Sequence, residues 1–325
     1  MTIRADEVID RRRLRRRLSF WRAATLVLAL LAIFGASVWL AGDEFGGTAA
    51  NHIAKVKIEG TITEDDELIA RLERIRKSSA VKGVVLSIDS PGGTTAGGEA
   101  IFDEVRRVAA EKPVVAQVGT LAASAGYMIA TATDHIVARQ SSIVGSIGVL
   151  LQYPDLSGLM DKLGIKLEEV KSSPLKAEPS PFKPTSDEAR AMVRNMIMDS
   201  YDWFIGLVVE RRPLTRAEVT KLADGSIFTG RQALGNKLVD ALGGEREAID
   251  WLASKGVDPD LRVIEWKPQR SGSSWLLSNS LAKAVARWLG LPEYDAGLIR
   301  ELGGERIFLD GLLSLWHPDN GLWGN

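Results

Sequence analysis

A serine at position 124 stands where an apolar run meets small residues and then an Ala/Met/Ile-rich stretch. The apolar run, residues 114–118, predicts a buried strand, and residues 125–130 predict a helix. The first N–H groups of a helix lack partners and favour negative charge. Ser124 therefore suits a nucleophile, but it equally suits a helix N-cap or a small packing residue.

A serine nucleophile needs a general base, and the chain contains three histidines. His52 lies in a linker, His317 lies near the terminus, and His135 precedes a short strand where a structural role is expected. A Ser-His-Asp triad is therefore poorly supported. Lysine is the alternative base if burial lowers its pKa from about 10.4 toward roughly 7–8. Lys176 is the best candidate because its irregular segment is flanked by apolar residues, although most lysines are simply exposed.

A glycine-rich turn is the third element with possible chemistry. Residues 89–93 read Asp-Ser-Pro-Gly-Gly and follow a predicted strand at 81–88. Consecutive glycines can present backbone N–H groups to a ligand. Such groups could stabilise an oxyanion beside Ser124, and the alternative is an ordinary tight turn.

Alternating strands and helices must position these residues, which predicts an α/β fold on one core. Strands are predicted at 53–59, 81–88, 114–118, 136–138, 143–149, 167–171 and 261–266. Helices are predicted at 68–76, 99–111, 155–163, 186–211, 215–222, 231–234 and 245–255. Four prolines make residues 173–185 irregular.

The N-terminus predicts a membrane anchor. Residues 23–41 carry no charge and would span roughly 28 Å as a helix. Six arginines between 11 and 17 precede them, so the N-terminus should stay cytoplasmic and the rest should be extracytoplasmic. An uncleaved anchor is favoured over a cleaved signal peptide because the apolar run is too long.

The expected organisation has five parts. They are a basic tail (1–20), the transmembrane anchor (21–41), a linker (42–52), the main α/β domain (53–268) and an amphipathic tail (269–325). The tail could dock on a subunit or contact a membrane surface, and docking is favoured because basic residues are few. The 325-residue chain has a net charge of −1 and no cysteine. These values suggest no nucleic-acid partner and exclude thiolate chemistry.

Four segments in order resemble the signal peptide peptidase A family in its short, single-repeat bacterial form. They are Asp-Ser-Pro-Gly-Gly at 89–93, Ala-Ser-Ala-Gly-Tyr at 123–127, Gly-Ser-Ile-Gly-Val at 145–149, and the lysine segment 171–182 ending in Ser-Pro-Phe. Each is weak alone, but the four in this order are specific. The resemblance covers residues 53–266.

The resemblance implies a Clp-protease/crotonase-type α/β fold, a β-β-α superhelix. It makes Ser124 the nucleophile and Lys176 the general base of a Ser/Lys dyad. It places the oxyanion-hole N–H groups on Gly93 and Ala125, and it gives Ser146 a hydrogen bond to the lysine amine. It implies no metal and no cofactor.

The resemblance implies a serine endopeptidase, anchored in the bacterial inner membrane, that degrades remnant signal peptides. The resemblance also implies a homo-oligomer, expected to be an octamer, whose active sites are built partly across subunit interfaces. Two other classes remain open from the residues: an acyl-CoA enzyme on the crotonase scaffold and a non-catalytic membrane scaffold on the same fold.

Overall fold

The computed structural model describes residues 50–268 and 313–315, together with Trp21, Thr25, Val27 and Leu28. The chain divides into two compact units, Met1–Asn51 and His52–Asn325. The four described residues before residue 50 are helical. Most of the expected anchor at 21–41, and most of the expected tail at 269–325, lie outside the described residues. Among the described residues, no helix is both long and apolar enough to cross a membrane.

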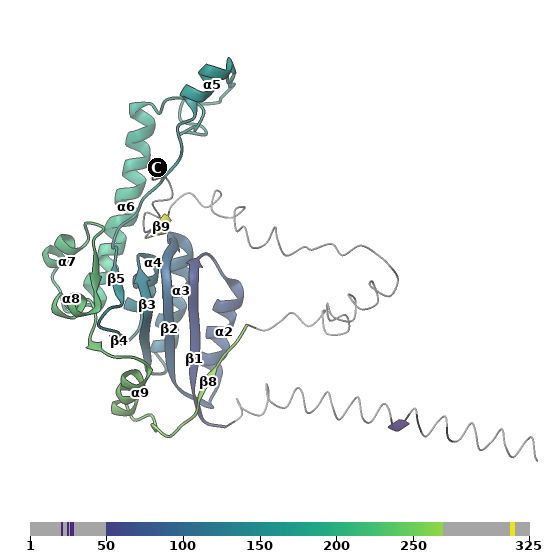
Figure 1. Cartoon of the computed structure of the whole chain (residues 1–325), viewed down its shortest axis with the longest axis vertical. Helices are drawn as coiled ribbons and strands as arrows, with labels where there is room; N and C mark the ends of the chain where they lie inside the picture. Colours follow the sequence, from purple (N-terminus) through teal and green to yellow (C-terminus); the bar gives the residue numbers. More distant parts are fainter. Residues whose placement is uncertain (1–20, 22–24, 26, 29–49, 269–312, 316–325) are drawn as a thin grey trace, which may run out of the picture. The chain divides into compact units, whose positions relative to one another are not determined.

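Parallel strands form the centre of the second unit (Figure 1). β1 (His52–Ile62), β2 (Val81–Thr94) and β3 (Val114–Ala123) lie side by side in one sheet. The first residues of β3 pair with β4 (His135–Ala138), and its last residues pair with β5 (Ile143–Gly145). The carboxyl ends of β2, β3 and β5 therefore meet at one edge of the sheet.

Four shorter strands complete the described part of the sheet. β8 (Val263–Glu265) runs parallel to β1, and β7 (Ala241–Leu242) runs parallel to β4. β6 (Ile227–Thr229) is antiparallel to β5. β9 (Leu313–Leu315) is antiparallel to the end of β2, although the two strands are more than 200 residues apart in sequence.

Helices cover both faces of the sheet, as a parallel sheet requires. One face packs on α2 (Asp66–Lys77), α3 (Thr95–Ala109), α4 (Ala125–Thr131) and part of α6 (Asp187–Arg211). The other face packs on α9 (Glu245–Ser254). Alternate residues of each strand enter the two cores, so Leu86 faces the first core and Val85 the second.

A segment between β5 and α6 extends away from the sheet (Figure 1). It contains α5 (Ser157–Leu163), which has no buried residue. After α6 the chain returns through α7 (Arg216–Leu222) and α8 (Gly230–Gly235). We call residues 150–198, which are most of this segment and the first half of α6, the arm.

The structure corrects two of the expected elements. Residues 167–171 form no strand, because Leu167 and Val170 are exposed and no neighbouring strand pairs with them. The strand expected at 81–88 continues to Thr94, so the glycine-rich segment 89–93 is extended rather than a turn. The other expected strands and helices are present, with ends that shift by several residues.

Candidate active site

Ser124 lies at the junction between β3 and α4 in a strained conformation. Its φ is 56° and its ψ is −121°, a region that residues with a β-carbon rarely adopt. Its side chain makes no N-cap hydrogen bond to α4, and the residue is 1% exposed. The capping role considered for this serine is therefore absent. A strained strand-to-helix turn is the setting in which many hydrolases hold a nucleophilic serine.

Backbone contacts hold the turn on both sides. The N–H of Ser124 donates to the carbonyl of Gly145 at 2.8 Å, and its own carbonyl accepts the N–H of Met128 at 2.9 Å. A β-carbon on Gly126 would lie 2.9 Å from the Ser90 carbonyl oxygen. The small residues after Ser124 thus allow α4 to start directly against β2.

Gly93 lies in β2 with both backbone edges paired. It pairs with Ile62 of β1 on one side and with Ser314 of β9 on the other. A β-carbon on Gly93 would lie 1.8 Å from the Ile62 carbonyl oxygen, so no other residue fits without moving β1. The sequence singled out this glycine, but nothing local indicated the pairing with β9.

Ser90 holds this part of β2 in place. Its hydroxyl donates to the Gly60 carbonyl at 2.6 Å and accepts the Gly92 N–H at 3.1 Å. The pairing of β1 with β2 shifts register between Glu59 and Thr61. The serine hydroxyl therefore bridges β1 and β2 where their ladder is interrupted. Sequence reasoning gave Ser90 no role of its own.

Ala125 and Ser146 lie beside Ser124. Ala125 is the next residue in the chain and is fully buried. It packs against α3, where a β-carbon on Gly98 would lie 3.1 Å from the Ala125 β-carbon. Ser146 follows Gly145, has a φ of 52° and is 8% exposed. Its N–H donates to the Ser226 carbonyl at 2.8 Å. The structure thus brings Ala125 and Ser146 to the Ser124 turn.

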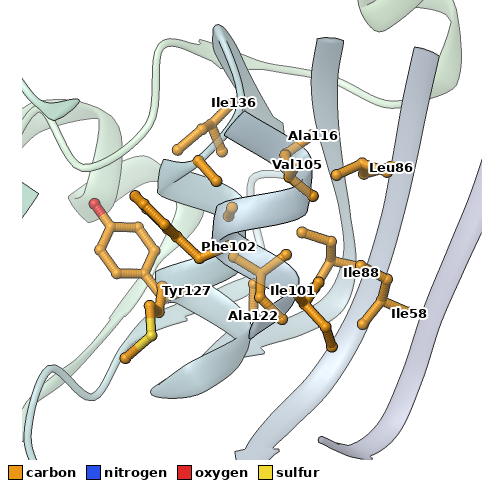
Figure 2. Packing of buried hydrophobic residues seen from close by; sticks show 14 of the residues in the cluster. Ile58, Leu86, Ile88, Ile101, Phe102, Val105, Ala116, Ala122, Tyr127 and Ile136 are labelled. Atoms are coloured by element: carbon orange, nitrogen blue, oxygen red, sulfur yellow. The ribbon is translucent and has the colours of Figure 1, made fainter. Parts of the chain in front are cut away.

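A dense apolar core supports this junction (Figure 2). Ile101, Phe102 and Val105 of α3 pack with Tyr127 of α4 in one cluster. The Tyr127 hydroxyl donates to the Leu238 carbonyl at 2.9 Å. Burial raises the pKa of Tyr127 far above its ordinary value, so this hydroxyl stays protonated and structural.

Lys176 does not lie with these residues. It is exposed on the arm, in the irregular segment between α5 and α6. In the part of the chain that the structure describes, its side chain has no hydrogen bond or ion pair, so it is not bonded to Ser124. Within this single subunit, the candidate nucleophile and the candidate base are separate.

His135 has the structural environment expected for it. Its ring stacks on Trp251 with centroids 5.0 Å apart, and Nδ1 lies 3.7 Å from the Asp240 carboxylate. Burial lowers the pKa of His135. Among the described residues, no group of three histidine, aspartate or glutamate side chains could bind a metal ion.

The fold and the strained serine together indicate a serine-type peptidase with a Clp-like α/β fold. Family models agree: residues 50–144 match the Clp protease model, and residues 106–258 match the model of peptidase family S49.

Relatives extend the match over most of the chain. "Putative signal peptide peptidase SppA" of Enterococcus faecium is 33% identical over 261 residues, which cover 75% of this chain and 74% of that protein. Protease 4 of Haemophilus influenzae is 34% identical over 78% of this chain and 44% of its own length. The chloroplastic serine protease SPPA of Arabidopsis thaliana is 28% identical over 82% of this chain and 40% of its own length.

The chain belongs to peptidase family S49. It is a serine-type peptidase whose substrates are peptides. This result sets aside the acyl-CoA enzyme and the non-catalytic scaffold.

Proposed function

We propose that the protein is a membrane-anchored endopeptidase that uses a dyad of Ser124 and Lys176. The Ser124 Oγ attacks the peptide carbonyl carbon while its proton passes to the neutral amine of Lys176. The lysine then gives that proton to the leaving amide nitrogen. Water hydrolyses the acyl-serine by the same proton exchange. The strained backbone of Ser124 is the observation that carries this proposal.

The N–H groups of Gly93 and Ala125 stabilise the oxyanion of the tetrahedral intermediate. Gly93 supports this role by its position at the carboxyl end of β2, beside the end of β3 that leads into Ser124. Ser146 orients the lysine amine by a hydrogen bond. The position of Ser146 supports this role, because it directly follows Gly145, whose carbonyl accepts the Ser124 N–H.

The lysine of each site comes from a neighbouring subunit of a homo-oligomer, for which we propose eight subunits. The exposed position of Lys176 on the arm favours this arrangement over a dyad within one chain. The arm also exposes large apolar side chains that a neighbouring copy would bury. They include Leu159, Leu163, Ile165, Val170, Phe182 and Met196.

The substrate binds as an extended strand along β2, with its scissile bond at Ser124. The segment from Gly92 to Thr94 supports this geometry, because it already pairs with an antiparallel strand, β9. We propose remnant signal peptides as the substrate class, since their apolar segments match an enzyme held at the bilayer. The architecture proposed for the whole domain, residues 53–268, is the crotonase-type β-β-α superhelix.

Residues 21–41 anchor the protein in the bacterial inner membrane, and residues 1–20 remain cytoplasmic. The uncharged stretch at 23–41 and the arginines before it support this topology. The peptidase domain then lies on the extracytoplasmic side, and residues 42–52 form the linker. Residues 269–325 form an amphipathic tail that docks on the oligomer. No nucleic acid and no cofactor take part.

Two single substitutions test the dyad. Ser124→Ala and Lys176→Ala should each abolish cleavage of casein or a model peptide, with the melting temperature unchanged. A fluorophosphonate probe should modify wild type at Ser124, as read by mass spectrometry. Full activity of Lys176→Ala would refute the assigned base, and probe attachment at another serine would refute the assigned nucleophile.

A further inference from the structure

Four charged side chains tie together the two ends of the segment that carries Lys176. Glu169 and Lys171 precede it, and Glu178 and Lys183 follow it. The Lys171 Nζ lies 2.7 Å from Glu178 Oε1 and 3.0 Å from Glu169 Oε2. The Lys183 Nζ lies 2.7 Å from Glu169 Oε2 and 2.5 Å from Glu178 Oε1. We call these four residues the four-charge cluster.

The four-charge cluster is electrically neutral and partly shielded from water. The side chain of Glu178 is 5% exposed and that of Lys171 is 16% exposed. Hydrogen bonds from Lys171 and Lys183 lower the pKa of Glu178 to about 2. Glu178 is therefore ionised at neutral pH. Because its carboxylate is enclosed, removing one partner leaves a charge without full compensation.

The chain between the two halves of the cluster turns tightly around Lys176. The Lys176 N–H donates to the Ser173 carbonyl at 3.2 Å, and the Glu178 N–H donates to the Leu175 carbonyl at 3.3 Å. Ala177 has a φ of 61°. Residues 172–177 are all exposed, so no core holds their conformation. The cluster supplies the side-chain contacts that fix this turn at its base.

We infer that Lys171 and Glu178 are positioning residues that hold the Lys176 turn in the geometry required for proton transfer. The inference rests on the proposed function of Lys176. Neither residue needs to touch the substrate, because each acts through the turn between them. If the turn shifts, the Lys176 amine is no longer aligned with the Ser124 hydroxyl. Proton transfer then slows even though the substrate still binds.

The test compares Glu178→Gln, Lys171→Met and Lys171→Arg in the full-length protein. The first two should lower kcat about 10- to 100-fold with little change in KM, because substrate binding along β2 does not involve the cluster. Lys171→Arg keeps the positive charge and should retain kcat within about threefold of wild type. Glu73→Gln is the matched control, because Glu73 pairs with Lys77 on the surface of α2 and should leave kcat unchanged.

A double variant, Lys171→Met with Glu178→Gln, separates positioning from misfolding. It removes one charge of each sign and leaves no new unpaired charge, so its melting temperature should match wild type. Its kcat should fall no further than that of either single variant, because both act through one turn. Wild-type kcat in this variant, or in both single variants, overturns the inference.

Failure of the inference and failure of the dyad give different results. If Lys176→Ala is inactive while Glu178→Gln and Lys171→Met both have wild-type kcat, the dyad stands and the positioning role is wrong. If Lys176→Ala is fully active, the proposed base itself is wrong and the positioning inference falls with it.

Discussion

The backbone N–H of Ser124 donates to the carbonyl of Gly145 at 2.8 Å, which joins the strained turn to the end of β5. Gly145 has a φ of 112°, so its own conformation is one that favours glycine. Two unusual backbone conformations are therefore fixed against each other by one hydrogen bond. The turn depends on β5 as much as on β3.

Gly145→Ala should lower the free energy of unfolding by about 1–3 kcal/mol and should reduce cleavage activity. The new β-carbon would lie 2.9 Å from the Ser226 carbonyl oxygen and 3.0 Å from the Phe228 ring. Urea unfolding and peptide hydrolysis measure both effects. Gly158→Ala is the matched control because a β-carbon there meets nothing within 4 Å. An active, fully stable Gly145→Ala protein would contradict the coupling.

Tyr127→Phe should cost about 1–2 kcal/mol of stability and leave kcat unchanged. The substitution removes the buried hydroxyl that donates to the Leu238 carbonyl, and that carbonyl then loses its partner. The ring continues to fill the same space in the core. Denaturant unfolding measures the stability, and a steady-state peptide assay measures kcat. A fall in kcat without a fall in stability would mean that Tyr127 has a role in the reaction.

The sequence predicts the strand, turn and helix around Ser124 because the signals for them are local. The apolar run before Ser124 and the small residues after it specify β3, the turn and α4. Ser186 caps α6 by accepting the Ala189 N–H, as the sequence at the start of that helix indicates. These features depend on neighbours within a few residues.

Other features depend on distant partners and could not be predicted in this way. Pro91 and the two glycines after it indicate a turn locally, yet pairing with β1 and β9 extends them. Residues 167–171 have a strand-like composition but no edge to pair with. The positive φ of Ser124 accompanies a close approach of α4 to β2, where Gly126 meets the Ser90 carbonyl, and this contact joins residues that are distant in the sequence.

His135 should make stability depend on pH. Burial lowers its pKa below the ordinary value, against the attraction of the Asp240 carboxylate. Below about pH 6.5 the unfolded chain therefore binds more protons at this residue than the folded protein does. The folded state consequently loses stability as pH falls from about 6.5 toward the lowered pKa.

Urea unfolding of wild type and His135→Phe at about pH 7.5 and about pH 5.5 measures this contribution. Phenylalanine keeps a ring against Trp251 but cannot bind a proton. The variant should lose less stability than wild type between the two pH values. Equal losses in both proteins would show that His135 contributes nothing to the pH dependence.

Ser314→Pro should lower the KM for an extended peptide substrate with little change in kcat. β9 pairs with the segment of β2 that we propose as the substrate edge, so its strand and a substrate strand would compete for the same backbone groups. Proline has no N–H and weakens a strand ladder. Ser314→Ala keeps the N–H and should behave as wild type. A higher KM in Ser314→Pro would place the substrate elsewhere.

Mixing two inactive variants should restore activity if the dyad forms between subunits. Ser124→Ala subunits carry an intact lysine, and Lys176→Ala subunits carry an intact serine. In oligomers assembled at random from equal amounts, about one quarter of the sites would combine an intact serine with a neighbour's intact lysine. The mixture should therefore approach a quarter of wild-type activity after joint refolding or co-expression.

The same experiment tests the alternative, in which Ser124 and Lys176 of one chain form the dyad. A dyad within one chain would leave every site in the mixed oligomer with one member missing, so activity would stay at the level of the single variants. The control mixes Ser124→Ala subunits with a protein that carries both substitutions, which supplies no intact serine and should remain inactive. Restored activity in the first mixture alone requires that Lys176 reach the Ser124 turn of a second subunit, as its exposed position on the arm allows.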